Sequence, residues 1–348
     1  MRADLFEPHG DTGWNQKLPE VTCRSFTHHE PDISVVIVSW NVASLLRDCL
    51  NSLEEESQVN NLRLQIIVVD NASTDNTVEM LQKEYPHVEL ITNSENVGFA
   101  VANNQGFALT KANYILVLNP DTYVKRNSLT ELLNSLKSNS DIGIACPKLI
   151  CPNGEIQITS ARRIQSLRHI ITIDILHLNR LPIVGKYIST LKYPYNYNST
   201  TFIEAGSGAA FLVKKEVISK LGGFEESFIH CGEDMDLFFR STRSGYKILY
   251  NPNAVIFHYG GQSSKQASET TYINACISVE LYLLRCRGYL TSKLYRIAII
   301  FWSFLRTLYY LLLMPFYRTR QDNLKREWRI LRKLISYKAL SSPSAEKT

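Results

Sequence analysis

A carboxylate lies where a predicted strand ends. Asp121 follows the apolar run Tyr114–Leu118, separated from it only by Asn119 and Pro120. A buried apolar run that stops at a polar residue places that residue at the carboxyl edge of a sheet, where open α/β sheets bind ligands. A carboxylate at that edge can hold a divalent cation, and the cation can hold a diphosphate. The competing interpretation is a turn-forming Pro-Asp pair.

A second carboxylate, Asp70, ends the apolar run that begins at Leu64. At a strand tip it can accept a hydrogen bond from a nucleobase or a ribose hydroxyl. Asp75, five residues later, is expected only to cap the next helix. Gly98 opens a predicted helix that ends near Leu109, and glycine permits close backbone approach to a ligand at a helix N-terminus that favours anions.

The chain contains a third group of acids, in the segment that follows Gly222-Gly-Phe-Glu-Glu. Glu233 and Asp234 occupy the first turn of a predicted helix, and Asp234 is the candidate general base for a transfer to a hydroxyl group. Compensation of the helix dipole is the structural alternative. Asp236 and Arg240 are four residues apart and are expected to pair with each other. His258 closes a short apolar strand and is a candidate metal ligand only if that strand ends near Asp121.

The elements that must position these groups alternate between strand and helix. The predicted strands are fully apolar, and amphipathic helical spacing separates them, which is typical of a parallel sheet covered on both faces. Residues 162–201 show no clear period and are predicted to be an irregular insertion where an acceptor could bind. Order returns with a helix over 233–244 and two short strands. The predicted strands cover residues 33–39, 64–70, 88–92, 114–118, 247–250 and 254–258.

Composition is that of a globular protein of 348 residues, with 45% hydrophobic and 20% charged residues. The net charge of +5 is unevenly distributed, because residues 281–348 carry 14 Lys/Arg against three acids. This basic tail includes the apolar segment Ile297–Tyr317, in which Arg306 disfavours a membrane-spanning helix by roughly 2.5–3.5 kcal/mol. We expect a helix that lies on a membrane surface; a helix packed on the core is the alternative. The aromatic and aliphatic content of the tail argues against a nucleic-acid partner.

Six motifs in a fixed order resemble the inverting glycosyltransferases of family 2, which have the GT-A fold, and in particular the subgroup of bacterial rhamnosyltransferases. The resemblance covers roughly residues 32–262. It rests on residues 35–41, 68–75, 96–104 and 118–121, on the segment 222–228 with 233–237, and on His258.

The resemblance implies a site and its partners. Asp121 and His258 would bind Mg²⁺ or Mn²⁺, Asp234 with Glu233 would be catalytic, and the donor would be a nucleoside diphosphate sugar, with dTDP-rhamnose one candidate. Asn119 replaces the first carboxylate of the family's metal motif, which leaves less charge on the metal. A lipid-linked or polysaccharide acceptor is implied as well. The implied donor-binding residues are Ser39, Trp40, Asn41, Asp70, Asn96, Gly98, Asn103 and Asn119.

The predicted organisation is a loose N-terminal extension over 1–31, a mostly parallel GT-A domain over 32–262 and a basic helical tail over 263–348. Seven cysteines without a disulfide or zinc pattern favour a reducing compartment, and with the tail they indicate the cytoplasmic face of the cell membrane. Two other functions compete. A sugar nucleotidyltransferase would need a glycine-rich phosphate loop where this chain has Ser39-Trp40-Asn41. A non-catalytic protein that retains the fold would have no need for acids at both 121 and 234.

Overall fold

The computed structural model describes residues 21–22, 30–176, 193–228, 231–260, 269–313 and 321–337. The strands are β1 (Val21–Thr22), β2 (Ile33–Ser39), β3 (Leu64–Asp70), β4 (Glu89–Thr92), β5 (Tyr114–Leu118), β6 (Thr122–Val124), β7 (Ile142–Ile150), β8 (Thr201–Ile203), β9 (Ala210–Lys214) and β10 (Lys247–His258). The helices of the first 260 residues are α1 (Ala43–Asn60), α2 (Thr77–Glu84), α3 (Phe99–Leu109), α4 (Ser128–Lys137), α7 (Lys215–Leu221) and α8 (Glu233–Arg243), with short turns η1 (Ile158–Ser160), α5 (Leu167–His169) and η2 (Ile170–Ile175).

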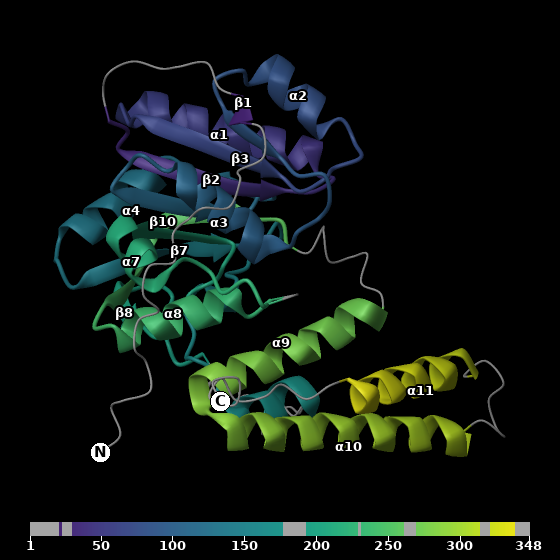
Figure 1. The fold of residues 1–348 in the computed structure, drawn as a ribbon. Coiled ribbons are helices and arrows are strands. Elements are labelled where there is room, and N and C mark those ends of the chain that lie inside the picture. Colours follow the sequence, from purple (N-terminus) through teal and green to yellow (C-terminus); the bar gives the residue numbers. More distant parts are fainter. Residues whose placement is uncertain are drawn as a thin grey trace, which may run out of the picture.

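One sheet of ten strands forms the centre of the molecule (Figure 1). Its order is β1-β4-β3-β2-β5-β9-β7-β10-β6, with β8 beside β10. The long strands run parallel except β9, which lies antiparallel between β5 and β7. The short strands β1, β6 and β8 also run antiparallel to their neighbours. The prediction of a mostly parallel sheet is therefore confirmed, and the carboxyl ends of β2, β3 and β5 meet at one edge.

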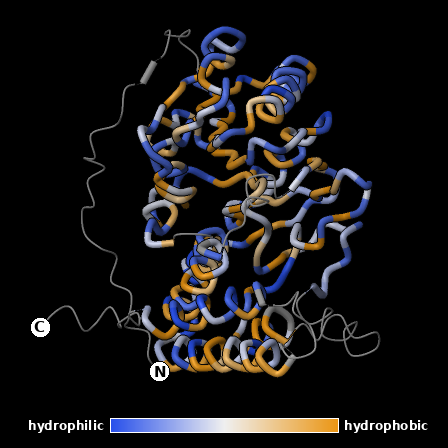
Figure 2. Tube along the Cα trace, turned by 90° about the vertical axis from the view of Figure 1, so that its right-hand side faces the viewer, coloured by the Kyte–Doolittle hydropathy of each residue, from blue (hydrophilic) through white to orange (hydrophobic). Residues whose placement is uncertain are grey.

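Helices cover both faces of the sheet because the apolar side chains of each strand alternate between them. In β2, Ile33, Val35 and Ile37 pack with the buried faces of α1, α2 and α4. Val36 and Val38 point to the other side, where α3, α7, α8 and the C-terminal helices pack. Figure 2 shows hydrophobic stretches, in orange, through the middle of the molecule and along the helices at its bottom.

The C-terminal part of the sheet differs from the prediction at one strand. The two predicted strands over 247–250 and 254–258 form one continuous strand, β10. Its pairing with β7 shifts register between Asn251 and Val255, around Pro252. Proline has no N–H to give to the ladder, so it is tolerated where the ladder is irregular. The break predicted between two strands is therefore an irregularity within one strand.

The predicted helical tail is present as α9 (Glu269–Arg287), α10 (Tyr289–Leu313) and α11 (Gln321–Ser336), which pack together at one end of the molecule (Figure 1). Residues 314–317 of the predicted apolar segment lie outside the described residues. Within the described residues, no helix combines the length and the apolar composition needed to cross a bilayer. In the predicted extension over 1–31, Val21–Thr22 pair with β4 and residues 1–20 and 23–29 lie outside the described residues.

Candidate active site

Two buried polar side chains meet at the carboxyl ends of β2 and β3. Ser39 and Asp70 are paired in the ladder, and Asp70 is only 2% exposed. The backbone N–H of Ser73 donates to Oδ2 of Asp70 at 3.0 Å. The other oxygen, Oδ1, and the hydroxyl of Ser39 are buried without a partner among the described residues, as is Oδ1 of Asn103 in α3. A buried polar atom without a partner costs about 1–3 kcal/mol, so these three atoms indicate where a polar ligand would bind.

The loops above these strand ends are held by asparagines. The Oδ1 atom of Asn41, which has a φ of 54°, accepts a hydrogen bond from the N–H of Thr74 at 2.6 Å. The Oδ1 atom of Asn96 accepts one from the side-chain amide of Asn71 at 2.9 Å. Both predicted donor-binding asparagines therefore shape the rim of the site. Asn71, which organises the loop that contains Asn96, was not predicted.

Asp75 has the structural role that the sequence predicts. Its Oδ1 accepts hydrogen bonds from the N–H and hydroxyl of Thr77 in the first turn of α2, and its Oδ2 accepts one from the N–H of Ala43 in α1. Hydrogen bonding thereby keeps the pKa of Asp75 below its usual value despite the opposing effect of burial. One carboxylate thus caps two helices beside the site.

Gly98 precedes α3 with a φ of 89°, a conformation that favours glycine. A Cβ atom at this position would meet no atom within 4 Å, so the backbone is open on that side. Gly98 can therefore let a ligand approach the first turn of α3. Trp40 and Asn119 are half-buried at the ends of their strands.

Asp121 and His258 lie together although 137 positions separate them in the chain. Strand β6 begins immediately after Asp121 and pairs antiparallel with the end of β10, where His258 faces Thr122. This pairing places Nε2 of His258 3.3 Å from Oδ1 of Asp121. The condition under which the sequence makes His258 a candidate ligand is thus met.

Gln157 orients the imidazole of His258. Its side-chain NH₂ donates to the hydroxyl of Thr159 at 2.8 Å, which turns its Oε1 towards Nδ1 of His258, also at 2.8 Å. Nδ1 then carries the proton, and Nε2 presents a lone pair to the carboxylate of Asp121. Nε2 of His258 and Oδ1 of Asp121 both present lone pairs and lie 3.3 Å apart, so we expect a cation or a proton between them. Gln157 lies in a short turn with no sequence pattern that could have identified it.

The pair fits a divalent cation that is shared with a substrate. Mg²⁺ and Mn²⁺ accept carboxylate oxygens, and Mn²⁺ also accepts an imidazole. Among the described residues no group of three His, Cys, Asp or Glu side chains forms a complete metal site. Asp121 and His258 would thus supply two ligands and leave the remaining positions to phosphate oxygens and water.

Asp234 lies in the first turn of α8 and is 15% exposed. Its Oδ2 accepts hydrogen bonds from Nη2 of Arg162 and from the backbone N–H of Gly208, both at 2.9 Å. The neighbouring carbonyl, that of Ala209, accepts the N–H of Asn119 at 2.8 Å. The segment Gly208–Ala209 therefore joins the base candidate to the strand end that precedes Asp121. Arg162, at the start of the irregular segment, was not predicted.

Glu233 precedes Asp234 and is buried. Burial raises the pKa of Glu233 to about 8, and the negative charge of Asp234 acts in the same direction. Glu233 is therefore mostly protonated at neutral pH. Only one of the two adjacent acids is available to accept a proton there.

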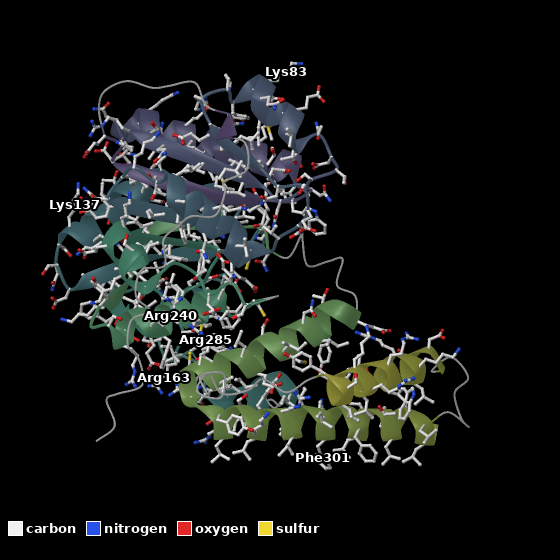
Figure 3. The ribbon with its side chains drawn as sticks, in the orientation of Figure 1. Lys83, Lys137, Arg163, Arg240, Arg285 and Phe301 are labelled. Atoms are coloured by element: carbon white, nitrogen blue, oxygen red, sulfur yellow. The ribbon has the colours of Figure 1, made fainter. Side chains whose placement is uncertain are left out.

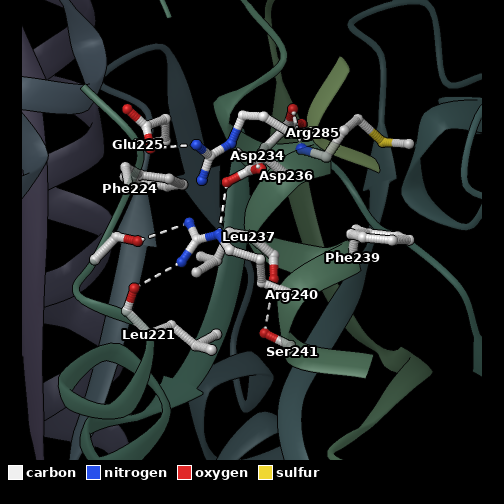
Figure 4. Close-up of polar contacts among 12 residues, drawn as sticks. Leu221, Phe224, Glu225, Asp234, Asp236, Leu237, Phe239, Arg240, Ser241 and Arg285 are labelled. Atoms are coloured by element: carbon white, nitrogen blue, oxygen red, sulfur yellow. Dashed lines mark hydrogen bonds and ion pairs between the residues drawn. The ribbon is translucent and has the colours of Figure 1, made fainter. Parts of the chain in front are cut away.

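Asp236 serves a different purpose, in a cluster shown in Figure 4. Its Oδ2 accepts a hydrogen bond from Nε of Arg240 at 2.6 Å, which confirms the predicted i,i+4 pair. Its Oδ1 accepts one from Nε of Arg285 in α9 at 2.9 Å, and Arg285 also pairs with Glu225 at 2.8 Å. Arg285 lies in the tail and was not predicted to contact this site. The cluster anchors the acid-bearing turn to the C-terminal helices.

Comparisons with known proteins identify the family. Residues 34–216 match the family described as glycosyl transferase family 2. A curated relative from Mycobacterium tuberculosis, N-acetylglucosaminyl-diphospho-decaprenol L-rhamnosyltransferase, is 26% identical over 67% of this chain and 77% of its own length. The O-antigen biosynthesis protein RfbC of Myxococcus xanthus is 23% identical over 68% of this chain but only 18% of its own length.

Two solved structures share the fold. A mannosyltransferase from Pyrobaculum calidifontis, in complex with GDP-Man and Mn²⁺, superposes with a TM-score of 0.50 and covers 88% of both chains at 15% identity. GalNAc-T7 with UDP, GalNAc and Mn²⁺ superposes with a TM-score of 0.54, over 89% of this chain and 57% of its own, also at 15% identity. The predicted GT-A fold is confirmed. Because the family match spans more than half of the sequence, the chain belongs to glycosyl transferase family 2.

Proposed function

We propose that this protein is an inverting, metal-dependent glycosyltransferase that moves a sugar from a nucleoside diphosphate donor to a lipid-linked or polysaccharide acceptor in cell-surface glycan synthesis. One observation carries the proposal: the Asp121–His258 pair and the carboxylate of Asp234 are joined through the two residues Gly208 and Ala209. This link supports one site in which the first pair would hold a diphosphate through a metal and Asp234 would accept a proton.

The donor would bind along the carboxyl edge of β2, β3 and β5. Oδ1 of Asp70 and the hydroxyl of Ser39 would bond to the nucleoside, since both are buried and have no hydrogen-bond partner in the part of the chain that the structure describes. Oδ1 of Asn103 and the open backbone at Gly98 lie along the same edge. Trp40, Asn41, Asn96 and Asn119 would complete the donor side.

Asp121 and His258 would hold Mg²⁺ or Mn²⁺, which when bound supplies positive charge to a departing diphosphate. The contribution of this chain is to fix both ligands beforehand. Gln157 bonds to Nδ1 of His258 and thereby turns the Nε2 lone pair of the imidazole towards Asp121. The backbone carbonyl of Asp121 accepts the N–H of Tyr259, which fixes the strand edge.

The chemical step would be a direct displacement. The acceptor oxygen forms a bond to the anomeric carbon while the bond from that carbon to the diphosphate oxygen breaks, and the hydroxyl proton passes to Asp234. Oδ2 of Asp234 is fixed by Arg162 and Gly208, so the carboxylate is oriented before the acceptor binds. Burial raises the pKa of Glu233, which favours its protonated form beside Asp234. Attack opposite the leaving group inverts the anomeric configuration.

The relatives guide the choice of partners. The mycobacterial relative is named for a diphospho-decaprenol acceptor and for L-rhamnose, which makes dTDP-rhamnose and a polyprenyl diphosphate the first compounds to test. A lipid-linked acceptor would place the reaction at the cell membrane. We place it at the cytoplasmic face, since the six cysteines of the described residues are all free.

A donor screen tests the proposal. Nucleotide release and thermal stabilisation would be measured with dTDP-, UDP- and GDP-sugars, with Mn²⁺, Mg²⁺ or EDTA. We expect one nucleotide to raise Tm. Asp121→Ala should abolish the part of this Tm shift that depends on metal. Asp70→Ala should abolish the whole Tm shift, with or without metal. Absence of stabilisation and of nucleotide release with every donor would refute the proposal.

A further inference from the structure

Helix α10 exposes an apolar face, unlike a typical helix on a protein surface in water. Its inward face combines buried Tyr295 and Ile299 with buried Ser292, Ser303 and Thr307. Its outward face exposes large apolar side chains at helical spacing over about 33 Å, at 1.5 Å per residue. These are Leu290, Leu294, Ile297, Phe301, Phe304, Leu305, Leu308, Leu311 and Leu312, called the α10 stripe from here on. Soluble monomers rarely expose an apolar patch of this extent unless it binds something.

Two of the three charged residues of α10 are turned away from the stripe. Arg306, in the middle of the apolar sequence, pairs with the buried Glu327 of α11. Arg296 pairs with the buried Glu280 of α9 at 3.3 Å. These two cations are thus neutralised inside the helical layer, while Nζ of Lys293 lies near the start of the helix, 4.9 Å from the centre of the Tyr289 ring. Figure 3 shows Phe301 pointing out from the far side of α10, away from the sheet.

The surroundings of the stripe are basic. Helices α10 and α11 together contain eight Lys/Arg and two acids. Lys325, Arg326, Arg332 and Lys333 of α11 are exposed. Two copies that met through this end would bring like charges together, which disfavours self-association. A membrane surface with anionic lipids would bind the apolar stripe and would attract the exposed basic side chains of α11, which packs against α10.

We propose that the α10 stripe docks this protein on an anionic lipid surface, with α10 lying along the membrane and its aliphatic and aromatic side chains among the acyl chains. The evidence for docking is the α10 stripe and the charges of α10 and α11. The purpose of docking, to bring the site to a lipid-linked acceptor, rests on the proposed function. The hydroxyl of Tyr282 in α9 donates to the carbonyl of Gln165 at 2.9 Å, close to Arg162 and hence to Asp234. Helix α9, which packs against α10, thus also contacts the segment that contains Arg162.

Flotation of the full chain with vesicles tests this inference. The vesicles would contain phosphatidylcholine alone, or phosphatidylcholine with about one third phosphatidylglycerol, at low and high salt. We expect flotation with the anionic vesicles, at least tenfold less for Ile297→Glu/Phe301→Glu, and no change for Phe202→Glu. Phe202 is a fair control because it is 52% exposed, against 59% for Phe301, and lies on the distant strand β8. Arg332→Gln and Lys333→Gln should each weaken binding to anionic vesicles about fivefold at low salt.

Three readouts decide the outcome. Unchanged flotation of Ile297→Glu/Phe301→Glu would overturn the inference, and so would self-association of the wild type that this variant abolishes while lipid binding persists. The milder variant Phe301→Ser, whose Tm is measured as well, separates loss of lipid binding from loss of folding. Stabilisation by nucleotide and Mn²⁺ reports on the proposed function separately. A variant that keeps the wild-type Tm but no longer floats supports docking, whatever the outcome of the donor screen.

Discussion

Two carboxylates on one turn of α8 have different roles, and replacing each by its amide should separate them. Asp236 is the structural one, because its side chain is 1% exposed and bonds to both Arg240 and Arg285. Loss of one partner from a buried ion pair costs about 3–5 kcal/mol. Asparagine keeps one acceptor oxygen and Arg285 keeps Glu225, so for Asp236→Asn we expect about 2–3 kcal/mol. At about 2 °C per kcal/mol for a chain of this size, Tm should fall by about 4–6 °C.

Asp234→Asn should act mainly on transfer. The side chain of Asp234 is 15% exposed, and an amide oxygen can still accept the N–H of Gly208. Its partner Arg162 is only 13% exposed and loses a charged acceptor, so the expected loss of stability is about 1–2 kcal/mol. The amide cannot take up the acceptor proton, so the transfer rate should fall by about 10²- to 10⁴-fold. Stabilisation by the donor nucleotide should persist.

The two variants would be compared in one set of assays: thermal unfolding, nucleotide stabilisation and single-turnover sugar transfer. Asp236→Asn is the matched control, since it makes the same chemical change two residues away. Transfer by Asp234→Asn at the wild-type rate would refute the assignment of the base. A Tm of Asp236→Asn equal to that of the wild type would refute the anchoring role of the arginine cluster.

Three further predictions concern the surroundings of the base. In Gly208→Ala the new Cβ would lie 3.0 Å from Cβ of Asp234, so single-turnover transfer should fall about 10- to 100-fold with nucleotide stabilisation retained. Burial raises the pKa of Glu233 to about 8, so between pH 4.5 and 8 the folded protein keeps a proton that the unfolded chain releases. The contribution of Glu233 to stability is therefore lost as pH rises through 8. The urea unfolding free energy should fall less between pH 5.5 and pH 8.5 for Glu233→Gln than for the wild type. Asn104→Leu removes the two 2.9 Å bonds between its amide and the backbone of Phe224, which should lower the urea unfolding free energy by about 2–4 kcal/mol while a far-UV spectrum stays unchanged.

The sequence predicts well what depends on local pattern. Apolar runs at β2, β3 and β5 identify buried strands, and each ends at or just before a polar residue of the site. The bonds of Asp75 to Thr77 and of Asp236 to Arg240 were predictable because each joins residues only a few positions apart. The same local logic predicts two strands at Pro252, and there it is wrong, because the ladder of β10 with β7 continues past the irregularity.

What the sequence does not predict depends on contacts between distant segments. Gln157 contacts His258 across 101 positions, and Arg162 contacts Asp234 across 72. Neither belongs to a pattern with a period or a cap, because each is positioned by a turn in the irregular part of the chain. The direction of Arg306 is of the same kind. Its partner Glu327 lies on α11, so the sequence alone does not predict that Arg306 points into the layer of C-terminal helices.

Contacts between the tail and the catalytic domain argue against an independent appendage. Arg285 of α9 neutralises Asp236 of α8 and Glu225 of the preceding loop, and burial of that guanidinium would be costly without both acids. The same helix holds α10 through the pair of Glu280 with Arg296. A lipid surface at the α10 stripe would therefore hold the turn that bears Asp234 at a fixed distance and orientation. Docking and catalysis would then be coupled by rigid packing, without any need for a conformational switch.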